Sequence, residues 1–417
     1  MELTTSRRGF LGASGVALAA ARLNAFQQKP KQLFAYVGRH TTGGFIGPPG
    51  KEGGINVFRV NMSDGSLTEV SKTGAEVDDL NSDGMCVSAD QRFLYSINVT
   101  PNLGGKGGVG GGVSAFAINP ADGSLRYLNT QLSMGGNPTA VLIDKTNSRV
   151  VVANHGAVNK IAVIKKRNGV PYVDTPTDDG TVALFSVKAD GSLESPLDVS
   201  VFEQRPSLDA GPGAACHGVI FDRTQRWIIA SDNGYDHIYV FPFDPALREL
   251  KPKAFPTPPG RAPRHFAAHP RAPFFFMTNE REASVSSFSF DSGNGEVRPV
   301  QTIATVPDGY SGPRVSPTDI RIHPSGKFVY SANRGDDSVA VFEVDEKTGR
   351  LTRVEVTKTG GQGPREINID PSGKFLFSCN LQTNDVTSFA LDANTGKMKQ
   401  SAQLSVLRAA VIDFALL

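Results

Sequence analysis

Cysteine is scarce in this chain, which has three cysteines among its 417 residues, Cys86, Cys216 and Cys379. They are far apart and form no Cys-x-x-Cys pair, so they provide neither a disulfide framework nor a zinc site, and the odd number leaves at least one free thiol. Neither sign of charge predominates, since 43 Lys and Arg residues oppose 41 Asp and Glu residues. Nucleic-acid binding needs a concentrated basic face, so we expect no nucleic-acid partner.

Long apolar runs are also missing. The apolar run from Leu11 to Ala21 is too short to span a bilayer as a stable helix. The twin arginines Arg7 and Arg8 precede this run, and small residues end it. For residues 1–30 this arrangement predicts a Tat-type signal peptide and linker, and hence a periplasmic or secreted protein with the Tat export machinery as a partner. A disordered basic tail is the alternative.

Glycine and proline are abundant, with 44 and 27 residues, as expected of a turn-rich β protein. A four-strand unit recurs along the chain, most clearly at residues 318–333 and 365–380. Each of these segments is a short strand, a Pro-Ser-Gly turn and a second strand that ends in Asn. An alternating third strand, a Thr-Gly turn and a polar fourth strand follow, and four short antiparallel strands are the composition of a propeller blade.

The number of repeats predicts how the ring closes. The residue that ends the second strand can be followed through seven units: Gly38, Asn98, Asn154, Asp232, Asn279, Asn333 and Asn380. The first unit lacks its innermost strand, and residues 409–414 are an apolar strand without partners. Pairing these ends would remove two exposed strand edges. We therefore predict that residues 31–417 form an all-β, seven-bladed propeller with four antiparallel strands per blade, closed by its N- and C-terminal strands. An insertion at residues 156–179 is predicted to be a loop with a short hairpin.

Polar residues gather at one predicted face of the ring. The start of the first strand and the end of the second lie on the same face of a blade, and in six units these points are 16 residues apart, as in Arg264 and Glu280. A ring held only by packing would place interchangeable residues there. We instead expect a polar funnel of Arg39, His155, His217, Arg264, His265, Glu280, Arg334 and Arg365, with Asp232, Asp319 and Asn333 beside it.

The charges of this funnel limit its ligands. Arginines at short range repel one another, so the cluster implies an anionic ligand or balancing carboxylates. The alternative is that these Asn and Arg side chains only connect the loops between blades. Arginines would oppose a calcium ion, and we expect neither a metal nor a cofactor. The chain has no Gly-x-Ser-x-Gly elbow, so a serine hydrolase mechanism has no nucleophile.

Several segments of the chain resemble the seven-bladed lactonase family, which includes bacterial 6-phosphogluconolactonase and fungal carboxy-cis,cis-muconate cyclase. The most specific are Asp232-Asn233-Gly234-Tyr235-Asp236, Pro263-Arg264-His265, Asn279-Glu280 and Asn333-Arg334-Gly335, and the resemblance runs from about Leu33 to the C-terminus. A His, two Arg and a Glu proposed to carry the chemistry of the cyclase match His217, Arg264, Arg334 and Glu280. The chain departs from the family at Ala215-Cys216-His217, where it has one histidine instead of two.

The resemblance implies the opening or formation of a lactone ring on an anionic, sugar-acid-like or muconate-like substrate. We expect a hydrolase that opens the ring of an anionic sugar-acid lactone, and we expect a monomer. Arg264 or Arg334 would stabilise the oxyanion that forms at the carbonyl. Glu280 would take a proton from water, and His217 would return it to the leaving alkoxide. The other funnel residues would bind the substrate. The alternatives are a muconate-type cycloisomerase and a non-catalytic propeller that binds an anionic metabolite or a protein partner.

Overall fold

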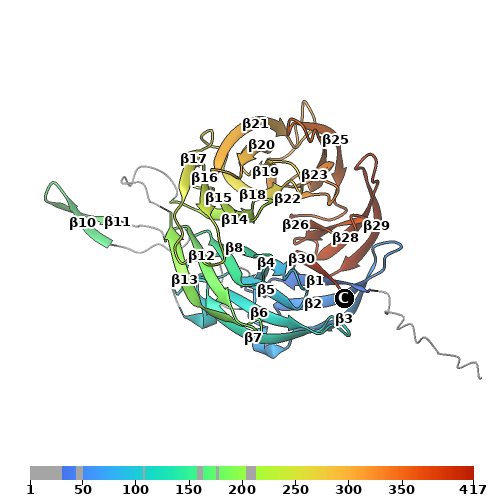
Figure 1. Ribbon diagram of the computed structural model, residues 1–417, viewed down its shortest axis with the longest axis horizontal. Helices are drawn as coiled ribbons and strands as arrows, with labels where there is room; N and C mark the ends of the chain where they lie inside the picture. Colours follow the sequence, from blue (N-terminus) through green and yellow to red (C-terminus); the bar gives the residue numbers. More distant parts are fainter. Residues whose placement is uncertain (1–30, 44–49, 107–108, 157–162, 175–177, 203–212) are drawn as a thin grey trace, which may run out of the picture. The chain divides into compact units, whose positions relative to one another are not determined.

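The computed structural model describes residues 31–43, 50–106, 109–156, 163–174, 178–202 and 213–417. From residue 32 onward the strands form seven four-stranded antiparallel sheets around a central axis (Figure 1). Helix in these ranges is limited to the short turns η1 (Ala75–Val77) and η2 (Leu103–Gly105). The seven-bladed architecture predicted from the repeat is therefore confirmed. The predicted export signal, residues 1–30, lies outside the described residues.

The seven blades follow one another along the chain, and we number them 1 to 7. The strands of each blade are given from the innermost to the outermost. Blade 1 consists of β30 (Ala409–Leu416), β1 (Leu33–Arg39), β2 (Gly54–Val60) and β3 (Leu67–Lys72), and blade 2 of β4 (Ser82–Val87), β5 (Phe93–Asn98), β6 (Gly112–Ile118) and β7 (Leu125–Leu132). Blade 3 consists of β8 (Pro138–Ile143), β9 (Arg149–Asn154), β12 (Thr181–Val187) and β13 (Leu193–Val201), and blade 4 of β14 (Cys216–Phe221), β15 (Trp227–Asp232), β16 (His237–Pro242) and β17 (Lys253–Pro256). Blade 5 consists of β18 (Pro263–Ala268), β19 (Phe274–Asn279), β20 (Ser284–Asp291) and β21 (Glu296–Ala304). Blade 6 consists of β22 (Ser316–Ile322), β23 (Phe328–Arg334), β24 (Ser338–Val344) and β25 (Leu351–Lys358). Blade 7 consists of β26 (Pro364–Ile369), β27 (Phe375–Asn380), β28 (Asp385–Leu391) and β29 (Met398–Ser405).

The insertion in blade 3 forms the predicted hairpin. Its strands β10 (Val163–Arg167) and β11 (Val170–Asp174) pair with each other as a separate two-stranded sheet. Among the described residues, no helix is long and apolar enough to cross a membrane.

The two ends of the propeller close blade 1 as predicted. The C-terminal strand β30 pairs antiparallel with β1, in a register that places Leu33 opposite Leu416 and Ala35 opposite Phe414. The Phe414 ring also lies 5.1 Å from the Phe377 ring of blade 7. The last strand of the chain therefore completes its own blade and packs against the neighbouring one.

The apolar core lies between the blades. Seven clusters of buried side chains each combine residues from two neighbouring blades. The second strands are apolar and buried on both faces, as in β27, where all residues from Phe375 to Asn380 are buried. The outermost strands are far less buried, as in β29, where Met398 alone is buried. Each blade therefore depends on its two neighbours for burial, and the ring frees its axis for polar side chains.

Candidate functional site

Each innermost strand carries an irregularity near its first residues, where one or two residues have no partner on the adjacent strand. Such β-bulges turn a side chain away from its regular direction and are frequent next to active sites. In the six complete units the unpaired residues include the first members of the 16-residue series: Asp83, Thr139, His217, Arg264, Thr318 and Arg365. The 16-residue spacing in the sequence therefore reflects a bulge that recurs at the same place in each of these innermost strands.

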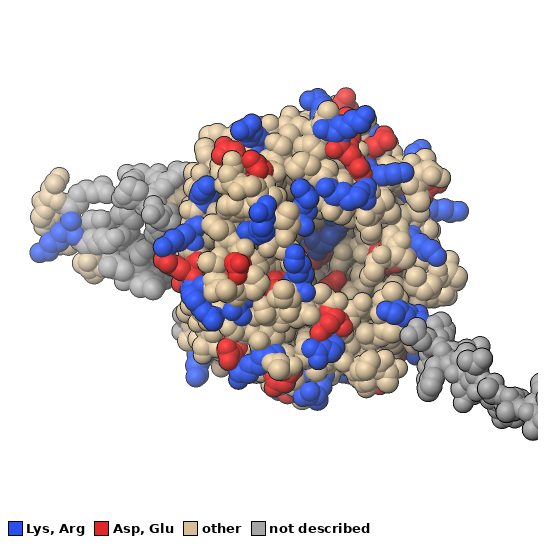
Figure 2. Space-filling model, in the orientation of Figure 1, with Lys and Arg blue, Asp and Glu red and all other residues tan. Residues whose placement is uncertain are grey.

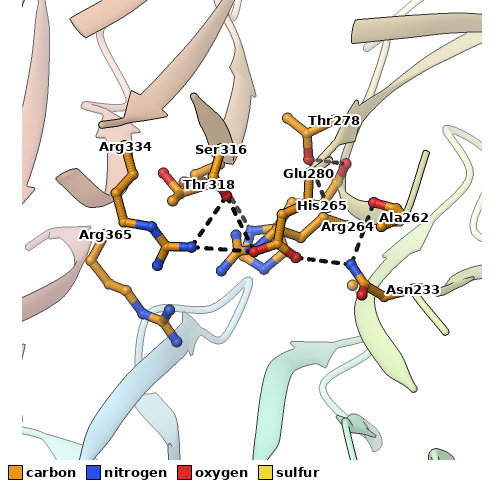
Figure 3. A network of polar contacts seen from close by, with 12 residues as sticks. Asn233, Ala262, Arg264, His265, Thr278, Glu280, Ser316, Thr318, Arg334 and Arg365 are labelled. Carbon is orange, nitrogen blue, oxygen red and sulfur yellow. Dashed lines mark hydrogen bonds and ion pairs between the residues drawn. The ribbon is translucent and has the colours of Figure 1, made fainter. Parts of the chain in front are cut away.

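Glu280 is the centre of a polar network on blades 4, 5 and 6 (Figure 3). Its Oε1 lies 3.8 Å from Arg264 Nε, its partner in the 16-residue series, and 3.2 Å from Arg334 Nη2. Ser316 Oγ donates to the same oxygen at 3.3 Å, and Asn233 Nδ2 donates to Oε2 at 2.9 Å. Both carboxylate oxygens of Glu280 are therefore occupied.

The charges around Glu280 decide its protonation. Burial opposes its ionisation, but the guanidinium groups of Arg264 and Arg334 and the hydrogen bonds from Asn233 and Ser316 outweigh burial and lower the pKa of Glu280 below its usual value. Glu280 is consequently ionised at neutral pH. Both of its oxygens already contact donors, and the role as base that the resemblance implied stays a prediction.

Arg264 is the most buried cation of the site. Its residue is 1 % exposed, and burial lowers the pKa of its guanidinium to about 10 despite the nearby charge of Glu280. Neither Nε nor Nη1 of Arg264 has a hydrogen-bond partner among the described residues. Buried donors without partners are costly, so these atoms are available to an acceptor that enters the channel.

A second carboxylate holds Arg365. Arg365 Nε donates to Asp83 Oδ1 at 2.8 Å, and its Nη2 contacts Oδ2 of the same carboxylate. His40 Nε2 lies 2.9 Å from Asp83 Oδ1. The charge of Arg365 helps to lower the pKa of Asp83 far below its usual range, against the effect of burial. The sequence left open whether a ligand or carboxylates balance the arginines. The structure has two such carboxylates, Glu280 and Asp83.

Three histidines form a row beside these arginines. The His217 ring lies 5.5 Å from the His155 ring and 5.1 Å from the His265 ring. Burial lowers the pKa of all three imidazoles, and the charge of Arg264 adds to this effect; the pKa of His265 falls to about 4. The three rings are therefore neutral at physiological pH. His265 Nδ1 lies 2.9 Å from Asp319 Oδ1, so Asp319 contacts the histidine row through His265.

Three predicted site residues have other contacts. Arg39 follows a register shift in β1 and donates to the backbone oxygen of Gly53, within its own blade. Asp232 Oδ1 accepts hydrogen bonds from the backbone nitrogens of residues 215, 234 and 235. Asn333 is fully buried and donates to Thr305 O and Ser338 Oγ. Among the described residues these hydrogen bonds join parts of a blade, or a blade to its connecting loop, which is the alternative interpretation stated above for Asn and Arg.

The sequence missed four residues of the site: Asp83, Asn233, Ser316 and His40. Asp83 and Asn233 belong to the 16-residue series and could have been included on that ground. Ser316 and His40 lie outside the series, and no repeat signal marks them.

The arrangement leaves open space along the axis. The space-filling view shows a hollow at the centre of the ring, with basic and acidic atoms inside it (Figure 2). A cavity of about 190 Å³ lies in the channel and is lined by residues of blades 2 to 7, among them Thr139, Gly218, His265, Arg321 and Glu366. Among the described residues, no group of three or more His, Cys, Asp or Glu is placed to hold a metal ion.

A ring of seven blades with arginines, carboxylates and neutral histidines around its axis defines a propeller with a polar channel site. The model of the family "Lactonase, 7-bladed beta-propeller" matches residues 34–414. The chain belongs to this seven-bladed β-propeller lactonase family, as its sequence motifs predicted.

Relatives and solved structures support this assignment. The chain is 30% identical over 334 residues to the 6-phosphogluconolactonase of Bacillus subtilis, an alignment that covers 80% of this chain and 84% of the relative. It is similar to the structure of a periplasmic gluconolactonase of Pseudomonas aeruginosa, with 28% identity, a TM-score of 0.74 and coverage of 92% of this chain and 99% of the other. A putative 6-phosphogluconolactonase of Bacteroides fragilis is 27% identical, with a TM-score of 0.73 and coverage of 92% and 98%.

Proposed function

We propose that this protein is an exported hydrolase that opens the ring of a sugar-acid lactone carrying one negative charge. The observation that carries the proposal is Arg264, whose buried guanidinium has two nitrogens without partners among the described residues. Those donors suit a carbonyl oxygen, because lactone hydrolysis passes through a tetrahedral intermediate whose oxygen becomes negative. Donors placed for that oxygen stabilise the transition state more than the substrate.

The charge of the site favours an anionic ligand. Three arginines (Arg264, Arg334 and Arg365) face two carboxylates (Glu280 and Asp83), and the three histidines are neutral. One positive charge is therefore unbalanced in this cluster. Arg334 is the most exposed of the three arginines, with 37% of its side chain accessible, against 2% for Arg264 and 14% for Arg365. We assign the anionic group of the substrate to Arg334 and the lactone carbonyl to Arg264.

Glu280 orients both arginines in this mechanism. Its Oε1 contacts both Arg264 and Arg334, so one carboxylate holds the two guanidinium groups near each other. His217 is neutral and lies between His155 and His265, where it can donate to the leaving alkoxide. The periplasmic gluconolactonase relative and the twin arginines of residues 1–30 support export.

Proton release from a panel of neutral, carboxylated and phosphorylated aldonolactones, with muconolactone included, tests the proposal. We expect hydrolysis of lactones, fastest for those with one negative charge. Arg334→Ala should raise KM for the charged lactones by about 10-fold or more, the effect of losing one charge-assisted contact, and should leave KM for neutral lactones nearly unchanged. A purified protein that binds these compounds without opening them would instead be a binding propeller.

A further inference from the structure

Of the two ring nitrogens of His265, which follows Arg264 in the sequence, one contacts a carboxylate and the other has no hydrogen-bond partner among the described residues. His265 Nδ1 lies 2.9 Å from Asp319 Oδ1. An ionised carboxylate only accepts hydrogen bonds, so Nδ1 carries the proton of the imidazole and Nε2 keeps its lone pair. His265 is 8% exposed, and its Nε2 is buried without a hydrogen-bond partner among the described residues. The lone pair of Nε2 is therefore available to a proton donor in the channel.

Asp319 is held in place by groups other than His265. Its Oδ2 lies 3.2 Å from Arg321 Nη2 and accepts a hydrogen bond from the backbone nitrogen of Ile367 at 3.1 Å. Although burial opposes ionisation, the charge of Arg321 and the contact with His265 lower the pKa of Asp319. The carboxylate of Asp319 is thus ionised and fixed, as is required of a group that orients an imidazole.

The bulge at the start of β18 places this imidazole beside Arg264. Residues 264 and 265 are consecutive and both lie in the bulge, which leaves them without partners on β19. Arg264 has open donors, and His265 has an open acceptor. The His265 ring also lines the cavity of about 190 Å³ together with the polar side chains of Arg321 and Glu366. Most residues of its lining are apolar, such as Val141, Leu142 and Phe266, but the cavity is large enough for water, and the polar side chains of His265, Arg321 and Glu366 can hold it there.

We propose that His265 is the general base of lactone hydrolysis and that Asp319 is its positioning residue. This inference rests on the proposed function. His265 Nε2 takes one proton from a water molecule as the water oxygen bonds to the lactone carbonyl carbon, whose oxygen binds Arg264. When the bond between this carbon and the ring oxygen breaks, the proton moves from Nε2 to the ring oxygen, directly or through His217. The product is the hydroxy acid, and His265 returns to its neutral form.

The surroundings of His265 set the pH dependence. The charged and titratable groups around it are Arg264 on its own strand, His217 on β14, Asp319 and Arg321 on β22, and Glu366 on β26, which lines the same cavity. Burial and the charge of Arg264 lower the pKa of His265 to about 4, and Asp319 only partly offsets them. The neutral imidazole is the active form, so kcat should be constant above this pKa and should fall about tenfold per pH unit below it.

Substitutions of the two residues test the proposal by kcat and KM for a responsive lactone. His265→Gln should lower kcat by about 10²- to 10⁴-fold with KM changed less than about threefold. Asp319→Asn should lower kcat comparably, because the amide can donate to Nδ1 and move the imidazole proton to Nε2. Imidazole added to His265→Ala should restore part of kcat, which a purely structural histidine would not allow. The control is His323→Gln, since His323 lies outside the channel and its Nε2 contacts Gly373 O at 2.9 Å.

The outcomes separate this inference from the proposed function. If the wild-type protein opens lactones while His265→Gln and Asp319→Asn both keep kcat within about threefold, His265 is not the base and the lactonase function stands. If the wild-type protein opens no lactone, the proposed function itself fails. Should the substitutions prevent folding, the pH profile of Glu280→Gln decides the matter. Loss of the acid limb in that variant would identify Glu280 as the base, whereas its retention supports His265.

Discussion

At the scale of the residue, Arg264 is the group that most needs an explanation. A buried guanidinium is unfavourable unless carboxylates and hydrogen bonds surround it. Its Nε lies 3.8 Å from Glu280, a weak contact, and two of its nitrogens have no hydrogen-bond partner among the described residues. A protein that kept such a group only for stability would gain by replacing it. A ligand oxygen that completes the set of acceptors accounts for its presence.

Glu280→Gln tests the role of the carboxylate that contacts two arginines. The amide keeps the shape of Glu280 but removes the charge between Arg264 and Arg334, so both guanidinium groups should lose their orientation. We expect KM to rise, kcat to fall less than in His265→Gln, and the free energy of unfolding to decrease by about 1–3 kcal/mol. Steady-state kinetics and urea unfolding measure these effects.

Glu282→Gln is the matched control for this substitution. Glu282 pairs with Arg261 at 2.8 Å, but its side chain is 44% exposed, so its loss should change stability by less than about 1 kcal/mol. A large fall in kcat for Glu280→Gln with unchanged KM would contradict the orienting role and return the base to Glu280.

At the scale of the element, the bulges of the innermost strands decide which side chains reach the axis. The start of β18 must also lie close to its neighbour β14, and Gly218 permits this approach. A Cβ atom at Gly218 would lie 2.2 Å from Arg264 O and 3.0 Å from His265 Cα. Ser231 Oγ donates to the same backbone oxygen of Arg264 at 2.7 Å. The backbone of blade 4 therefore positions the two consecutive site residues of blade 5.

Gly218→Ala should displace the start of β18 and its two site residues. Backbone atoms cannot yield as a flexible side chain can, so we expect a loss of about 1–3 kcal/mol in stability and a fall in kcat of about tenfold or more. Thermal unfolding and lactone hydrolysis measure the two effects. Gly293→Ala is the control, because a Cβ there would be 3.0 Å from the Asp291 carboxylate, a side chain at the surface. Equal activity of the two variants would show that blade 4 does not position Arg264.

At the scale of the whole molecule, the ring is stable only when it is closed. Each apolar cluster belongs to two blades, so an open ring would leave two uncovered faces and an unpaired strand. The last strand, β30, completes blade 1 and covers Phe377 of blade 7. Closure by one terminal strand thus links the two ends of the fold in a single cooperative unit.

Deletion of residues 408–417 should abolish this closure. The truncated protein would expose the edge of β1 and the apolar surface under Phe414, so we expect aggregation or loss of a single cooperative thermal transition. Deletion of residues 1–30 is the control and should leave the transition unchanged, since blade 1 begins at Leu33. A protein without residues 408–417 that melts like the full chain would contradict the role of β30.

The proposed export of the whole molecule can be tested at the N-terminal arginines. Replacing Arg7 and Arg8 together by lysine should keep the protein in the cytoplasm, because the Tat machinery recognises the arginine pair. Cell fractionation and immunoblotting of the two forms measure this. Equal periplasmic yield would exclude the Tat assignment.

The sequence by itself determined the blades, their number and their closure. A blade is a local pattern of four strands and short turns, and each turn depends on only a few neighbouring residues. Repetition of this pattern along the chain makes the blades recognisable in the sequence. The 16-residue series also indicated which residues lie in the bulges of the innermost strands, because the bulge recurs at one place in each of these strands.

The tertiary structure decided which polar side chains meet and what charge remains. Arg365 and Asp83 are 282 residues apart in sequence, and only the closed ring brings them into contact. Arg39 follows a register shift and contacts Gly53 of its own blade. Asp232 and Asn333 form hydrogen bonds within a blade or with its connecting loop. Sequence spacing states which face of the ring a residue reaches, but not which partner it finds there, because partners come from different blades.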